Sequence, residues 1–243
     1  MRFRSLVAGL FRRKKISTST HTAHHPAVSA KLSEQFMLPA QWVLQQEDER
    51  VALFHNAMGD VLTINFFPAK PDIEAPIDDV VALRAFYRRT AAANGLALIE
   101  TELAQLTGLS TVRTLFKARM TQTRGFAFIG SYTLPFANCS YVIKVQSIEQ
   151  GVTGMREAAI MVLMGPPKID DATGELVGWT QDPYDSGYRT EFMRNLADDQ
   201  KFDEQFPDHP LSKARTYLAE IETGVRVDPA IYELQPFIYS TSI

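Results

Sequence analysis

Few side chains of this sequence have the chemistry of a nucleophile, a general base or a metal ligand. Three of the five histidines fall within the first 25 residues, which leaves His55 and His209 for the rest of the chain. A Ser-His-Asp or Cys-His arrangement would need one of these two imidazoles to meet a nucleophile in space. The single cysteine, Cys139, begins a strand-like segment and is interpreted as a small buried side chain, not a thiolate. No phosphate-binding loop, dinucleotide fingerprint, zinc-protease motif or calcium loop occurs, so we expect no catalytic site and no cofactor.

A group of carboxylates between residues 198 and 208 is the strongest candidate for metal chemistry. Its members are Asp198, Asp199, Asp203, Glu204 and Asp208. Carboxylate oxygens are the ligands that Mg²⁺ and Ca²⁺ prefer, so a metal-assisted hydrolase built on this group is an alternative function. Runs of charge are more often solvated faces, and the sequence analysis therefore assigns no metal to it.

Three basic residues share one face of a predicted strand. Over residues 111–121 apolar and polar side chains alternate, which places Arg113, Lys117 and Arg119 on the same side. An antiparallel sheet commonly keeps one polar, solvated face, and this is the favoured interpretation. The alternative is that the acidic C-terminal segment, or an acidic partner, covers the face. We predict Arg113, Lys117 and Arg119 as the binding surface for an acidic partner protein.

The elements that must position these residues follow one order along the chain. With 243 residues, 45% hydrophobic and 22% charged, the chain is typical of one large globular domain with appendages. A hairpin is predicted over 51–67, and helices over 79–94 and 153–164, with strands between them at 96–104, 111–121, 125–134 and 140–146. Such short connections require antiparallel neighbours. We predict an α+β fold over residues 34–167, with the helices packed on one side of an antiparallel sheet.

The C-terminal third differs in composition from the predicted core. Between residues 168 and 223 there are 13 acids and six bases. An irregular segment carries Trp179, Tyr184 and Tyr188, which we expect to pack against the sheet because exposed rings favour aggregation. Pro210 follows His209 at the start of a helix that ends near residue 223. Residues 168–243 are therefore predicted to be an acidic, irregular and helical appendage packed on the core.

The first 33 residues hold seven Lys and Arg and no acid. With few large apolar residues after Phe11, this segment is predicted to be a disordered basic arm. It is interpreted as a solvated tail in weak contact with anionic membranes, as a mitochondrial or plastid transit peptide, or as a stretch whose true start codon is open. No specific nucleic-acid partner is expected. The predicted location is cytoplasmic and membrane-peripheral, with an organelle as the alternative.

The order of elements from residue 42 to 164 resembles the PsbP-like family. That family includes a photosystem extrinsic subunit, a Ran-binding nuclear import factor and bacterial relatives tied to secretion systems. The residues that carry the resemblance are the hairpin end Leu62-Thr63-Ile64-Asn65-Phe66-Phe67, the helix stretch Leu83-Arg84-Ala85-Phe86-Tyr87-Arg88-Arg89, and Gly95. The resemblance implies a scaffold that binds other proteins, generally without catalysis. The chain beyond Pro167 departs from the family pattern.

These observations predict a non-catalytic protein-binding module. A bacterial secretion-associated adaptor or chaperone, or a toxin-neutralising protein, would fit the resemblance. Two alternatives come from other classes: the metal-assisted hydrolase that uses residues 198–208, and an auxiliary subunit imported into an organelle.

Overall fold

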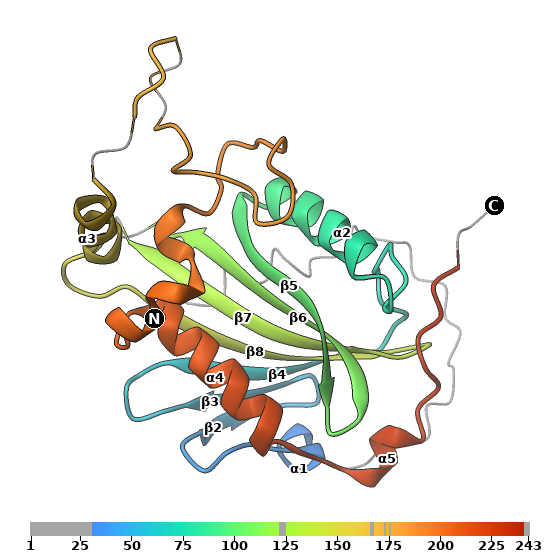
Figure 1. The fold of residues 1–243 in the computed structure, drawn as a ribbon. Helices are drawn as coiled ribbons and strands as arrows, with labels where there is room; N and C mark the ends of the chain where they lie inside the picture. The colour runs from blue at the N-terminus through green and yellow to red at the C-terminus, as the bar shows by residue number, and fades with distance from the viewer. Residues whose placement is uncertain (1–30, 122–124, 166–167, 173, 175, 241–243) are drawn as a thin grey trace.

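The computed structural model describes residues 31–121, 125–165, 168–172, 174 and 176–240, and is built around one large sheet (Figure 1). Its seven strands lie in the order β2-β3-β4-β8-β7-β6-β5, and every neighbouring pair is antiparallel. The α+β class and the antiparallel sheet are thus confirmed. The strands are β2 Val43–Glu47, β3 Val51–His55, β4 Val61–Phe67, β5 Leu96–Leu106, β6 Leu109–Arg119, β7 Phe126–Pro135 and β8 Ser140–Ile148.

Local sequence signals set the ends of the early elements. Strands β3 and β4 are joined by a turn in which Gly59 takes a φ of 80°, a conformation that glycine adopts without strain. Helix α2 (Val80–Ala93) begins after Asp79, whose carboxylate accepts hydrogen bonds from the Val81 and Ala82 amides at 3.0 and 2.9 Å. The hairpin and the first helix are therefore as predicted.

Helices cover both faces of the sheet. Adjacent β6 residues point to opposite sides: Phe116 belongs to the cluster that includes α2, and Leu115 packs with Leu211 and Ala214. Those last two residues lie on helix α4 (Pro210–Gly224), which runs across the sheet in Figure 1. This differs from the expected one-sided arrangement, because the C-terminal helix occupies a face that was expected to be solvated.

Helix α4 approaches the sheet closely over β7. A Cβ added to Gly130 would lie 2.7 Å from Leu218 Cδ1, which is closer than side chains tolerate. Gly130 thus makes room for the helix. Beside it, the Tyr132 hydroxyl donates to the Leu218 carbonyl oxygen and to Glu222 Oε2.

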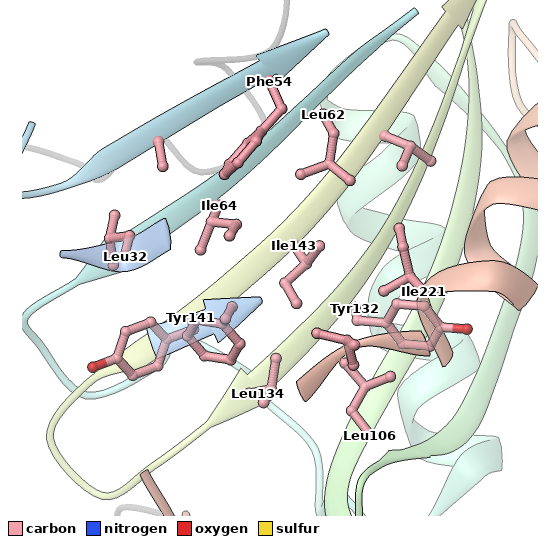
Figure 2. Packing of buried hydrophobic residues seen from close by; sticks show 14 of the residues in the cluster. Leu32, Phe54, Leu62, Ile64, Leu106, Tyr132, Leu134, Tyr141, Ile143 and Ile221 are labelled. Carbon is pink, nitrogen blue, oxygen red and sulfur yellow. The ribbon is translucent and has the colours of Figure 1, made fainter. Parts of the chain in front are cut away.

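The C-terminal third supplies part of the main hydrophobic core. Figure 2 shows Ile221 packed in one cluster with strand residues such as Leu62 and Ile143, and with Leu32 from the start of the described chain. Short elements complete this layer: α1 Leu32–Gln35, α5 Pro229–Tyr232, and the strand pair β1 Phe36–Met37 with β9 Arg226–Val227. The region expected to be an appendage is therefore built into the core.

The boundary of the predicted basic arm also shifts. Residues 1–30 lie outside the described part of the chain. Leu32, however, is buried, and the Ser33 hydroxyl donates to Glu47 Oε2 at 2.9 Å. The folded chain thus includes the last residues that were assigned to the arm.

Helix α3 (Met155–Met164) lies beyond the end of β8, close to the predicted bounds. The described residues between 168 and 177 form a projection away from the rest of the molecule (Figure 1), and Trp179 packs against Ile160 of α3. An isolated bridge joins Ile169 to Leu176 in this projection. Two short 3₁₀ helices, η1 Leu196–Asp198 and η2 Gln200–Gln205, then lead to α4. Within the described residues, no helix has both the length and the apolarity needed to cross a bilayer.

Candidate functional site

Lys117, the centre of the predicted basic surface, is buried. Its Nζ lies 3.0 Å from Asp198 Oδ1 and 3.0 Å from Glu157 Oε1, and the side chain has 0% exposure. The ammonium group also lies 4.3 Å from the ring centroid of Phe126. A buried charge is tolerated when it is paired and hydrogen-bonded in this way. A partner protein therefore cannot reach Lys117 while α3 and η1 stay in place.

The other two basic residues have separate environments. Arg113 donates to Glu100 Oε2 at 2.8 Å and is 24% exposed. Arg119 is 58% exposed, and its guanidinium lies 4.3 Å from the Phe192 ring centroid. The favoured interpretation of an open, solvated basic face is corrected: the acidic C-terminal segment covers Lys117, as the alternative had it. Arg113 is paired with Glu100 of the neighbouring strand β5, and only Arg119 of the three is more than half exposed.

The ion pairs continue from this point into the C-terminal segment. Glu100 also accepts from Arg215 Nε at 2.5 Å, and Arg215 pairs with Asp203 at 2.9 Å. Asp203 in turn accepts from Arg156, which is 1% exposed and also donates to the Ala197 carbonyl oxygen. Sequence reasoning missed Arg156, although a single cation inside the apolar α3 sequence was a signal that it has buried partners.

The carboxylates of residues 198–208 do not converge on a common point. Asp198 and Asp203 are neutralised by cations of the same chain. Asp199 accepts the Lys201 amide at the start of η2, whereas Glu204 and Asp208 are exposed. The predicted alternative, a metal-assisted hydrolase on this group, lacks a gathered ligand set in the described structure.

A different trio brings three ligand atoms within 4.8 Å of one another: Glu149, Glu157 and His209. His209 Nδ1 accepts the Leu211 amide at the start of α4, at 3.2 Å. A neutral imidazole whose Nδ1 accepts must carry its proton on Nε2, the atom that lies 3.6 Å from Glu149 Oε1. The Nε2 lone pair that a metal needs is then unavailable. The Lys117 ammonium also occupies Glu157, so the trio fits an ion cluster better than a metal centre.

The two remaining reactive candidates have no catalytic partners. Cys139 is buried, as predicted, and burial raises the pKa of its thiol to about 11. His55 is exposed at the end of β3. Among the residues that the structure describes, neither the Cys139 thiol nor the His55 imidazole is hydrogen-bonded to the other or to His209.

Several of the large apolar side chains that are exposed lie on α3 and on the chain segments directly before and after it. Met155, Ala158 and Val162 recur at three- and four-residue spacing, so they share one exposed face of the helix. We define the α3 surface as seven large apolar residues, each between 55% and 81% exposed: Val152, Met155, Val162, Leu163, Met164, Ile169 and Val177. The sequence did contain a signal for this surface: α3 has more apolar residues than one buried face of a helix needs, so some of them must be exposed.

The α3 surface rests on a fixed support. On the inner side of the helix, Ile160 packs with Trp179, Ala197 and Phe202. Arg156, on the same side, donates to Ser212 Oγ at 2.8 Å and so ties α3 to α4. Of the predicted aromatic segment, Trp179 thus packs under α3, while the Tyr184 hydroxyl binds the backbone of Thr101 at the edge of β5.

Comparisons with known proteins do not assign the chain to a family. No family model matches it, and no curated protein matches it. One solved structure, a protein from Bacteroides thetaiotaomicron, is 11% identical, with a TM-score of 0.31. The match covers 49% of this chain and 40% of that one, so this chain spans less than half the length of its structural match. The resemblance to the PsbP-like family stays a prediction.

Proposed function

We propose that this protein is a non-enzymatic protein-binding module that contacts its partner through the α3 surface. The observation that carries the proposal is the gathering of seven large apolar side chains, each more than half exposed, on one helix and the projection beside it. Contiguous exposed apolar surface on a folded protein marks an interaction site or an aggregation hazard. Because buried Arg156 and Ile160 hold the helix, binding would cost little conformational entropy.

The composition of the α3 surface favours a protein over an anionic membrane. Helices that lie on membranes carry Lys and Arg along their polar face. The one cation of α3, Arg156, is buried, and among the described residues of the projection the exposed charges are Lys168, Asp170 and Asp171. An acidic partner is no longer proposed at Arg113, Lys117 and Arg119, because Lys117 is buried and cannot contact a partner. The α3 surface fits instead a partner with an apolar groove and a neutral or weakly basic rim.

A charge placed in the α3 surface tests this proposal. The double change Val162→Asp with Leu163→Asp should reduce capture of the protein's partner at least tenfold, measured by quantitative pull-down from native lysate. Val81→Asp is the matched control, because Val81 is 71% exposed on α2, in another part of the molecule. The control should capture the same partner as the unchanged protein. Equal capture by the double variant would move the contact elsewhere.

The basic arm supports a second, weaker contact. Its seven bases without an acid would attract an anionic membrane and hold the protein at the cytoplasmic surface. Flotation with phosphatidylserine vesicles should therefore fall as salt rises. The organelle alternative predicts a mature N-terminus just after Ala30, which N-terminal sequencing of the native protein would detect.

The hydrolase alternative is tested by calorimetry. Stoichiometric heat on adding magnesium, calcium or manganese, abolished by Asp199→Ala with Asp203→Ala, would favour it. We expect no such heat, because Asp203 is already bound by Arg156 and Arg215.

A further inference from the structure

A cleft of about 330 Å³ opens on the face of the sheet that carries α2. Its floor is made by the ends of three adjacent strands, where Phe67 pairs with Ser140, and Val142 pairs with Thr133. This volume lies at the lower end of the range typical of small-molecule sites. The cleft is on the other side of the sheet from α4 and is independent of the α3 surface.

The walls of the cleft are held by the core. One wall is α2, which contributes Phe86, Tyr87 and Thr90. The other is the proline-rich connection from β4 to α2, which is anchored because Ile73 and Ala75 are buried in the same cluster as Tyr87. A ligand would thus meet a site that is already formed.

Aromatic rings line the interior. The Phe86 and Tyr87 rings lie edge to face, with centroids 5.0 Å apart, and Phe67 adds a third ring from the floor. Tyr87 belongs to the buried cluster under α2, and this packing fixes the orientation of its ring. Aromatic faces carry negative potential and attract cations such as ammonium and guanidinium groups.

Two carboxylates stand at the mouth of the cleft. Asp72 and Glu74 both line it and are exposed. Among the described residues that line the cleft, the one cation, Lys70, has its Nζ 3.3 Å from Ser240 Oγ and 5.8 Å from the Phe237 ring centroid. Two carboxylates against one ammonium group leave the lining of the cleft with a net negative charge.

We propose that this cleft binds a small organic cation, with its ammonium or guanidinium group between the aromatic rings and the Asp72 and Glu74 carboxylates. The rings supply cation–π attraction and apolar contact, and the carboxylates supply charge complementarity. Both features favour the same class of ligand.

A second cation on this face of the sheet is Lys144, which does not line the cleft. It lies on β8 two residues beyond Val142, and burial lowers its pKa to about 8. If Lys144 dominated the site, an organic anion would be preferred. Aromatic ligands of opposite charge therefore distinguish a site dominated by Asp72 and Glu74 from one dominated by Lys144.

Calorimetric titration with benzyltrimethylammonium, benzoate and benzyl alcohol provides this test. We expect the ammonium compound to bind the full chain and to bind more tightly than the other two. Asp72→Asn with Glu74→Gln should weaken its binding about fivefold to tenfold, and Phe86→Ala should weaken it as well. Asp78→Asn, an exposed acid of the same connection outside the cleft, is the matched control and should bind as the unchanged protein does.

Three results would overturn the proposal. These are tighter binding of benzoate, equal binding of all three compounds, and absence of measurable ammonium binding by the unchanged protein. Thermal unfolding of each variant separates loss of the ligand from loss of the fold. Because the partner test uses α3 and this test uses the cleft, either proposal can fail without the other.

Discussion

Lys117 Nζ and Asp198 Oδ1 lie 3.0 Å apart, with side-chain exposures of 0% and 1%. One residue comes from the middle of the sheet and the other from the C-terminal segment that covers it. The acidic composition of that segment therefore has an internal role: it neutralises basic side chains of the sheet. Burying such a pair need not stabilise the fold, but removing one member leaves an uncompensated charge.

Loss of Lys117 should destabilise the protein strongly. Lys117→Ala leaves the buried Asp198 carboxylate and the Glu157 carboxylate without their cation. We therefore expect the free energy of unfolding to fall by about 3–5 kcal/mol. Urea denaturation measures this change. Arg119→Ala, at the exposed end of the same strand, should cost less than about 1 kcal/mol. Comparable losses in the two variants would contradict the burial of the Lys117 pair.

Gly130 should resist substitution because of its contact with α4. A methyl group at this position meets Leu218 Cδ1 at 2.7 Å, so Gly130→Ala should lower the free energy of unfolding by about 1–3 kcal/mol. Shortening the neighbour tests the cause. In the background of Leu218→Ala, the added methyl group should cost much less, and an unchanged cost would show that the backbone, not the contact, is responsible.

The Cys139 thiol should be unreactive in the folded protein. Its pKa is raised to about 11 by burial, so at pH 8 little thiolate is present and reagents lack access. Reaction with a disulfide reagent should be slow in buffer and rapid in urea. Fast labelling of the folded protein would mean that the end of β8 opens readily.

Glu149 should contribute an acid-sensitive part of the stability. Burial raises the pKa of its carboxyl group, but the nearby His209 side chain and the hydrogen bonds donated by the Gly154 and Phe126 amides lower it by more, so the net shift of the pKa is downward. Because the folded pKa lies below the unfolded value of about 4.3, the contribution is present above that value and is lost as the pH falls through the folded pKa. The stability gap between the unchanged protein and Glu149→Gln should thus narrow from pH 6 to pH 3 in urea titrations. A gap that is constant over this range would refute the assignment.

The strands of the sheet could be predicted from local sequence patterns. The packing of α4 and the C-terminal segment on that sheet could not. The alternation from Val112 to Arg119 assigns each β6 side chain to its correct face, and Asp79 marks the start of α2. An apolar stripe on α4, however, does not say which surface it covers. Lys117 looks the same in sequence whether water or the Asp198 carboxylate faces it.

The candidate site was missed for a related reason. The apolar sequence of α3 predicts burial, and only the folded arrangement shows that Ile160 faces inward while Val162 and Leu163 face outward. The cleft depends on rings brought together from β4 and α2, whose separation in sequence gives no sign of contact. Local sequence patterns do not determine which residues that are distant in the sequence come into contact.

The pairing of Phe36 with Val227 has a consequence for the synthesis of the protein. A ribosome that adds about 5–20 residues per second needs roughly ten to forty seconds to pass from the first of these residues to the second. For most of that interval, the apolar sheet residues that Leu218 and Ile221 cover in the folded protein stay exposed on the nascent chain. We therefore expect the nascent chain to bind ribosome-associated chaperones. A chain truncated before α4 should aggregate and should not fold into a smaller domain.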